Sequence, residues 1–231
     1  MSGLASYRQP PEPAFLFDLD GTLIDSVYQH VIAWRESLME VGINLSVWKI
    51  HRRIGMSGGL FVSALVREID TPLDHETLAA LPRLHGEAFL RHYDGVRPLP
   101  GATELLATLT DLGVPWAIAT SGAERYARRG VELLGLPADT PLVTRDQVRY
   151  AKPDPDLFLT AADRLGVDIR DSLVLGDSIW DMIAAQRARG LGVGLLSGGY
   201  GEEELARAGA FRVYEDPADL LKHIDEVAAR A

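Results

Sequence analysis

The sequence predicts an α/β fold, in which a doubly wound parallel sheet carries a helical domain inserted after its first strand. The apolar run at 15–20 is typical of a buried strand, and after about residue 98 similar short runs alternate with helical patterns. The stretch 26–96 is helical and has no convincing strand. Because the short runs are apolar on both faces, we expect a parallel sheet covered by helices on both sides.

The first predicted strand is FLFDLD at 15–20, and the other strands follow the inserted stretch. They are PWAIAT (115–120), TPLV (140–143), SLVLG (172–176), LGVGLL (191–196) and AFRVY (210–214). Segments with helical periodicity separate them, at 102–113, 123–135, 155–166, 179–190 and 201–210. The alternation of strand and helix is the pattern of a doubly wound core.

The inserted stretch contains three helical segments, at 26–42, 59–70 and 75–95. The chain returns to the sheet near the turn signal RPLPG at 97–101. We therefore expect a core domain made of residues 1–25 and 97–231, and a helical cap domain made of residues 26–96.

Composition narrows the functional classes. The formal net charge of −10 argues against nucleic acid or an anionic membrane as a partner, and no feature indicates a protein partner. No apolar run approaches the roughly 18 residues of a membrane helix, and the N-terminal stretch 1–14 is too polar and proline-rich for a signal peptide. A cytoplasmic protein is expected. The absence of cysteine excludes disulfides, thiolate metal sites and cysteine nucleophiles.

Chemically reactive side chains follow four of the predicted strands. In open parallel sheets ligands bind beyond the carboxyl ends of the strands, so these positions are candidates for a shared site. They are Asp18 and Asp20; Thr120, Ser121 and Gly122; Lys152; and Asp177 and Asp181. The four stretches bring acids, hydroxyls and a lysine to one edge of the sheet.

These stretches form four motifs, FDLDGTL (17–23), ATSG (119–122), AKPDPD (151–156) and GDSIWD (176–181). In this order they resemble the haloacid dehalogenase superfamily of phosphohydrolases. More narrowly, they are similar to the branch with phosphoglycolate phosphatases, sugar-phosphate phosphatases and β-phosphoglucomutase, whose members carry a helical cap between the first two motifs. The resemblance covers nearly the whole chain from Phe15 on and implies hydrolysis of a small phosphate ester.

The resemblance implies distinct roles for the two acids of the first motif. A phosphate monoester is anionic, so a carboxylate that attacks it needs a cation, and Mg²⁺ binds carboxylate and phosphate oxygens together. Asp18 would ligate Mg²⁺ and attack phosphorus to form an aspartyl-phosphate. Asp20 would ligate the metal through its backbone carbonyl, while its side chain protonates the leaving oxygen and later activates water.

The other motifs are expected to bind the phosphoryl group and the metal. Thr120 is the favoured hydroxyl donor, with Ser121 beside it, and the backbone N–H groups that follow, including that of Gly122, would also contact the phosphoryl group. Ser121 could equally be a helix N-cap. Lys152 would neutralise Asp18 and the phosphoryl group. Asp177 is a metal ligand that also stands at an N-cap position, and Asp181, one turn later, is a ligand through water or a supporting acid.

The predicted cap offers two further candidates. His30 lies where resembling mutases and many phosphatases of this branch carry a histidine, although a lone helical histidine is more often structural. Arg53, with Arg52, belongs to HRRIGMSGG (51–59), an expected specificity loop with glycines that allow closure over a ligand. These arginines could meet an anionic part of the substrate or lie on a solvated face.

The sequence favours a phosphatase over the alternatives. Mutases of the branch typically have an acid where Gly176 stands, and they use a cap lysine that lies later in the chain than Lys49. A β-phosphoglucomutase-like mutase remains the alternative. Lys49 has no context that supports the Schiff base of phosphonate hydrolysis. A catalytically inactive ligand-binding module is a further alternative, but it predicts a lost motif residue, and every motif is complete.

Overall fold

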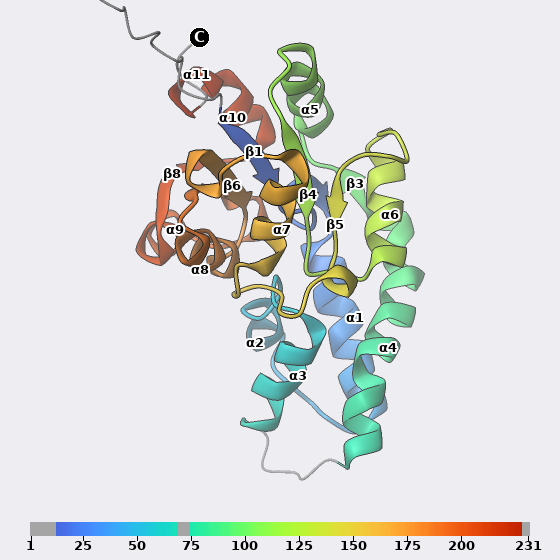
Figure 1. Ribbon diagram of the computed structural model, residues 1–231. Helices are drawn as coiled ribbons and strands as arrows, with labels where there is room; N and C mark the ends of the chain where they lie inside the picture. The colour runs from blue at the N-terminus through green and yellow to red at the C-terminus, as the bar shows by residue number, and fades with distance from the viewer. Residues whose placement is uncertain (1–12, 69–73, 228–231) are drawn as a thin grey trace, which may run out of the picture.

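The computed structural model describes residues 13–68 and 74–227, and a six-stranded parallel sheet forms its centre (Figure 1). The strand order is β5-β4-β1-β6-β7-β8. The strands are β1 Ala14–Phe17, β4 Trp116–Ala119, β5 Leu142–Val143, β6 Ser172–Gly176, β7 Leu191–Leu195 and β8 Ala210–Tyr214. All described pairings in this sheet are parallel, which confirms the predicted fold class.

Helices cover both faces of the sheet. Successive side chains of a strand point to opposite faces, and because both sets are apolar, each face needs a layer of helices. Phe15 and Phe17 belong to one hydrophobic cluster and Leu16 to the other. The first cluster includes residues of α5 Ala102–Asp111, α6 Glu124–Leu133 and α10 Pro217–Lys222. The second includes residues of α7 Asp156–Leu165 and α8 Ile179–Ala188. The remaining core helices are α9 Glu202–Ala208, packed against β7, β8 and α8, and α11 Ile224–Val227.

The inserted stretch is helical, as predicted, and extends below the sheet in Figure 1. Its helices are α1 Val27–Glu40, α2 Val47–His51, α3 Gly58–Val66 and α4 His75–His92. They enclose a hydrophobic cluster of their own, to which Trp34, Leu38 and Phe61 belong. The short helix α2 was not expected from the sequence.

A two-stranded ribbon joins the insertion to the core. Its strands, β2 Ile24–Asp25 and β3 Arg97–Pro98, pair antiparallel, so the chain leaves the core and returns to it side by side. Strands of two residues carry no periodicity, and the sequence did not predict them. The domain boundaries after residues 25 and 96 stay a prediction.

The first strand is shorter than predicted. It ends at Phe17 rather than at residue 20, because the chain turns at Gly21, where φ is +84°, and Asp20 forms only an isolated bridge with Ile24. Asp18 and Asp20 therefore follow the strand and do not share its alternation. Among the described helices none is long and apolar enough to cross a membrane, and the cytoplasmic location stays a prediction.

Candidate active site

Three buried carboxylates meet at the carboxyl ends of β1 and β6. Asp18 and Asp177 directly follow these neighbouring strands, and the Asp18 N–H donates to the carbonyl oxygen of Leu175 at 2.8 Å. Asp181 lies in the first turn of α8. Each of the three offers a carboxylate oxygen within 4.8 Å of the others, and none is more than 4% exposed.

Lys152 lies against this cluster and is fully buried. Its Nζ is 2.5 Å from Oδ1 of Asp18 and 2.8 Å from Oδ1 of Asp181. Burial alone would lower the pKa of Lys152, but the two carboxylates outweigh it and raise that pKa. The lysine therefore stays charged and links the third motif to the first and the fourth.

The cluster carries more negative charge than one lysine balances. Burial raises the pKa of Asp18 to about 7; Lys152 lowers this pKa and Asp181 raises it. Burial, followed by Asp181 and Asp18, raises the pKa of Asp177 well above its ordinary value. Ionised together, the three carboxylates need a second cation, and oxygen donors so close suit a divalent ion. The donor set fits a metal site.

Close packing fixes the carboxylate of Asp177. Oγ1 of Thr22 donates to its Oδ1 at 3.0 Å. A Cβ atom at Gly198 would lie 1.8 Å from Oδ2 of Asp177, and one at Gly21 would lie 2.5 Å from it. Only glycine fits at either position. Gly198 was not expected from the sequence, although it ends the short 3-10 turn Leu196–Gly198 that follows β7, the next strand along the sheet.

Asp181 has two separate contacts. The N–H and Oγ of Ser178 donate to its Oδ2, at 3.1 and 2.6 Å, while its Oδ1 faces Lys152. Ser178, and not Asp177 as predicted, is the N-cap of α8. Asp177 does not cap the helix because its carboxylate accepts the Thr22 hydroxyl and is enclosed by Gly21 and Gly198.

The side chain of Asp20 lies outside the carboxylate cluster. Its Oδ1 accepts a hydrogen bond from Oγ of Ser26 at 2.6 Å and lies 3.2 Å from Nε2 of His30. Burial would raise the pKa of Asp20, but His30 and Ser26 outweigh it and lower that pKa. The first motif thus places one acid against a lysine and the other against a histidine of the insertion.

The second motif borders the same space. Thr120, Ser121 and Gly122 line a cavity together with Asp18 and Asp20. The Gly122 N–H donates to Oγ1 of Thr120 at 3.0 Å. Oγ of Ser121 is buried and has no hydrogen-bond partner in the part of the chain that the structure describes. Ser121 does not cap α6, whose N-cap is Ala123.

The cavity has a volume of about 430 Å³ and lies between the core and the insertion. Arg53 lines it, as expected, but its guanidinium also pairs with Glu68. Arg52 is not a lining residue; it pairs with Glu204 and lies over the ring of Tyr200. Of the two adjacent arginines, Arg53 therefore lines the cavity and Arg52 does not.

One further expectation about the insertion needs revision. Gly58 and Gly59 form the first turn of α3, so they are not part of a loop. Lys49 pairs with Glu68 at 3.7 Å and is absent from the cavity lining, which agrees with the lack of a supporting context in the sequence.

The cavity is also lined by residues that the sequence did not single out. Six of them are aromatic or basic: Trp34, His85, Phe89, Tyr93, Tyr126 and Arg145. Tyr126 and Arg145 follow β4 and β5, so the strand-end rule could have found them. The other four lie on α1, on α4 or just after α4, and only the packing of the insertion brings them to the site.

Comparisons with known proteins agree with this geometry. The family of haloacid dehalogenase-like hydrolases matches residues 13–189. A phosphoglycolate phosphatase of Rhodospirillum rubrum is 34% identical over 220 residues, which cover 90% of this chain and 88% of that protein. Hexitol phosphatase A of Escherichia coli is 35% identical over 166 residues, covering 71% of this chain and 74% of that protein.

Solved structures share the fold. A hydrolase from Pseudomonas syringae is 52% identical and superposes with a TM-score of 0.91, covering 94% of this chain and all of that one. A putative β-phosphoglucomutase from Bacteroides vulgatus superposes with a TM-score of 0.83 over 95% of this chain and 90% of that one. At 23% identity, the second likeness shows the fold alone.

Proposed function

Because the chain belongs to the haloacid dehalogenase-like hydrolases, we propose that its phosphatase activity depends on Mg²⁺ and proceeds through an aspartyl-phosphate on Asp18. The chain is a phosphatase of this family that acts on small phosphorylated metabolites. One observation carries the proposal: Asp18 lies among two other carboxylates and Lys152, while Asp20 stands apart with His30.

Asp18 is the proposed nucleophile. Mg²⁺ would be held by Asp18, Asp177, Asp181 and the backbone carbonyl of Asp20. There it would offset the negative charges of the carboxylates and of the phosphoryl group. An oxygen of Asp18 attacks phosphorus, the bond between phosphorus and the ester oxygen breaks, and the leaving oxygen takes a proton from Asp20. Asp20 then takes a proton from a water molecule, whose oxygen attacks phosphorus. The bond between phosphorus and the Asp18 oxygen breaks, which releases inorganic phosphate and restores the Asp18 carboxylate.

Asp20 must hold a proton before the first step. In the free protein His30 and Ser26 keep the pKa of Asp20 below its ordinary value. The arriving phosphoryl group is a like charge and raises this pKa. Proton uptake by Asp20 is thus coupled to substrate binding.

The phosphoryl group would be held opposite Asp18. Lys152 supplies a fixed positive charge, and the N–H groups after Thr120 supply hydrogen-bond donors. We keep Thr120 as the proposed hydroxyl donor, because its Oγ1 already accepts the Gly122 N–H and is free to donate its proton to a phosphoryl oxygen. The unpartnered hydroxyl of Ser121 is the alternative donor.

The volume and the lining of the cavity favour a substrate whose leaving group is larger than glycolate. Its volume of about 430 Å³ falls in the range of pockets for whole metabolites. The phenol oxygens of Tyr93 and Tyr126 are buried without hydrogen-bond partners among the described residues, and both side chains line the cavity. A sugar or polyol phosphate would supply hydroxyl partners for them. Burial and the charge of Asp20 raise the pKa of Tyr93 to about 12, so its hydroxyl remains a donor.

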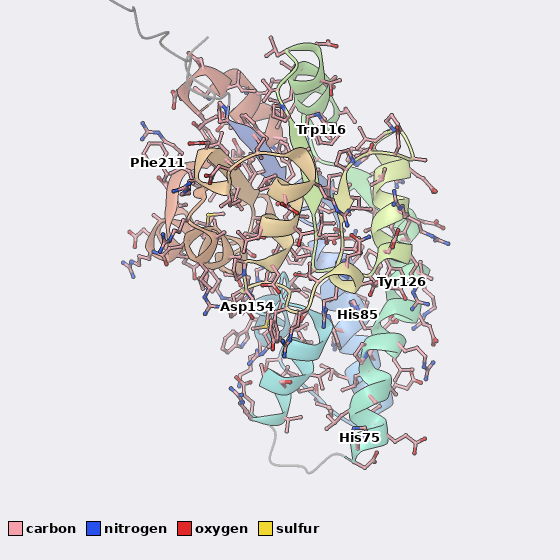
Figure 2. The ribbon with its side chains drawn as sticks, in the orientation of Figure 1. His75, His85, Trp116, Tyr126, Asp154 and Phe211 are labelled. Atoms are coloured by element: carbon pink, nitrogen blue, oxygen red, sulfur yellow. The ribbon has the colours of Figure 1, made fainter. Side chains whose placement is uncertain are left out.

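The proposal is tested by inorganic phosphate release from 2-phosphoglycolate, hexose phosphates and hexitol phosphates, with and without Mg²⁺. We expect release that requires Mg²⁺, is fastest on a sugar or polyol phosphate, and disappears in Asp18→Asn. Asp154→Asn is the matched control, because Asp154 belongs to the third motif but pairs with Arg187 at the surface (Figure 2). Release that survives Asp18→Asn, or that needs no metal, would contradict the mechanism.

A further inference from the structure

A continuous chain of contacts connects Asp20 to helix α4. His30 of α1 uses both ring nitrogens: Nε2 lies 3.2 Å from Oδ1 of Asp20, and Nδ1 lies 3.1 Å from Nε2 of His85 on α4. None of these contacts is local in the sequence, since His30 and His85 are 55 residues apart. His85 has no role in the mechanism described above.

Aromatic rings clamp both histidines. The ring of His30 stacks on Phe89 with 3.8 Å between centroids and planes 7° apart. The ring of His85 stacks on Trp34 at 4.2 Å and 14°. Trp34 in turn stacks on Phe61 of α3 at 3.9 Å. Rings stacked in this way keep their nitrogens at fixed positions, because rotation of either imidazole would break a stack.

The chemistry of imidazole places a proton of His30 toward Asp20. A neutral ring has one N–H donor and one acceptor nitrogen. Burial, followed by His30, lowers the pKa of His85, so His85 is neutral. When His30 is neutral as well, Nε2 of His85 donates to its Nδ1; when His30 is charged, its Nδ1 donates to Nε2 of His85. In both cases Nε2 of His30 carries a proton that faces the carboxylate of Asp20. Ser26 donates to the same carboxylate oxygen.

From this geometry we infer that His85 is a positioning residue. It holds the ring of His30, and through it the carboxylate of Asp20, in the direction of the leaving oxygen. The inference rests on the proposed function, because it assumes that Asp20 protonates that oxygen. Helix α4 then has two roles, since it lines the leaving-group cavity and also fixes the orientation of the acid at the end of that cavity.

Two aryl esters of similar shape test the inference. Phenyl phosphate releases a basic phenoxide, which needs a proton in the transition state, whereas 4-nitrophenyl phosphate releases a stable anion, which does not. In His85→Leu, we expect kcat/KM to fall by roughly 10- to 100-fold for phenyl phosphate and by less than about threefold for 4-nitrophenyl phosphate. A purely structural defect would lower both values equally.

Two further variants complete the design. His85→Gln keeps an amide that can donate to Nδ1 of His30 or accept from it, so we expect it to restore much of the activity on phenyl phosphate. His75→Leu is the matched control, since His75 is an exposed histidine at the far end of the same helix (Figure 2). It should leave both substrates unaffected. If His85→Leu does not fold, His85→Asn, whose shorter amide does not reach His30, takes its place.

The outcomes separate this inference from the proposed function. Equal losses on the two esters, or no loss on either, would overturn the role of His85 while leaving the phosphatase intact. Failure of the wild-type protein to hydrolyse either ester with Mg²⁺ would overturn the proposed function itself.

Discussion

Three aspartates of this chain show how strongly the surroundings of one side chain decide its chemistry. Asp18 and Asp20 are two residues apart, yet one contacts a buried lysine and the other a histidine and a serine. Asp177 contacts neither of these basic residues and is enclosed by Thr22 and two glycines. The different contacts support a nucleophile, a proton carrier and a metal ligand, respectively.

Asp177→Asn should abolish activity and yet stabilise the metal-free protein. The change removes one of three crowded charges, and the amide oxygen of Asn can still accept the hydrogen bond from Thr22. At pH 8 without metal, we expect a gain of about 1–2 kcal/mol in the free energy of unfolding, or roughly 2–8 °C in Tm. Calorimetry in a chelating buffer measures this increase in Tm.

The surface variant Asp154→Asn is the control for that measurement. A lower Tm for Asp177→Asn at pH 8 without metal would show that the three carboxylates are not strained by their mutual repulsion.

At the scale of elements, helix α2 and the turn after it attach the insertion to the core. Nε2 of His51 lies 2.8 Å from the carbonyl oxygen of Gly198. The hydroxyl of Tyr200 donates to the carbonyl oxygen of Arg52 at 2.9 Å, and the guanidinium of Arg52 pairs with Glu204. Gly198 also borders Asp177, so this attachment ends beside the proposed metal site.

Arg52→Ala should weaken substrate binding more than chemistry. The change removes the pair with Glu204 and the cation–π contact with Tyr200 at 4.1 Å, together worth about 1 kcal/mol at a partly exposed position. We expect KM to rise roughly fivefold, with kcat within about twofold of the wild type. Steady-state kinetics on the best ester measure both constants.

Arg83→Ala serves as the matched control, because Arg83 forms an exposed pair with Glu87 within α4 and does not line the cavity. An unchanged KM in Arg52→Ala would mean that this attachment does not help to close the cavity.

At the scale of the whole molecule, the active site exists only where core and insertion meet. The core supplies the four motifs, and the insertion supplies His30, Arg53 and most of the aromatic lining. The ionisation of the carboxylate cluster makes this junction sensitive to pH, because burial raises the pKa values of Asp18 and Asp177.

The stabilising effect of Mg²⁺ should grow with pH. Carboxyls whose pKa is raised in the folded state bind protons more tightly there, so their contribution to stability is present at low pH. It is lost as the pH rises from about 4 toward 7, where Asp18 ionises in the folded state. Mg²⁺ needs the ionised carboxylates, so we expect a larger rise in Tm at pH 8 than at pH 5.5.

Thermal unfolding with Mg²⁺ or a chelator, at pH 8 and at pH 5.5, measures the rise in Tm that Mg²⁺ causes at each pH. In Asp177→Asn, this rise should differ less between the two pH values. A rise in Tm that is larger at pH 5.5 would argue against a metal held by these carboxylates.

The sequence by itself determined the sheet and the reactive end of each strand. Buried parallel strands are short apolar runs, and this signal is local, so each of the six strands lies within two or three residues of its predicted bounds. Asp18 and Asp177 follow their strands directly, and the other motif residues lie in the loops and helix ends beyond the strands. Asp18, Lys152, Asp177 and Asp181 were therefore predicted to meet, and the structure brings them together.

Only the tertiary structure decided which side chains of the insertion reach the site. Arg52 and Arg53 are neighbours in the sequence, but one faces the core surface and the other the cavity. His85 meets His30 across 55 residues, and the ribbon of β2 and β3 joins segments more than 70 residues apart. Such contacts depend on how helices pack and where side chains point, and neither property has a local signal in the sequence.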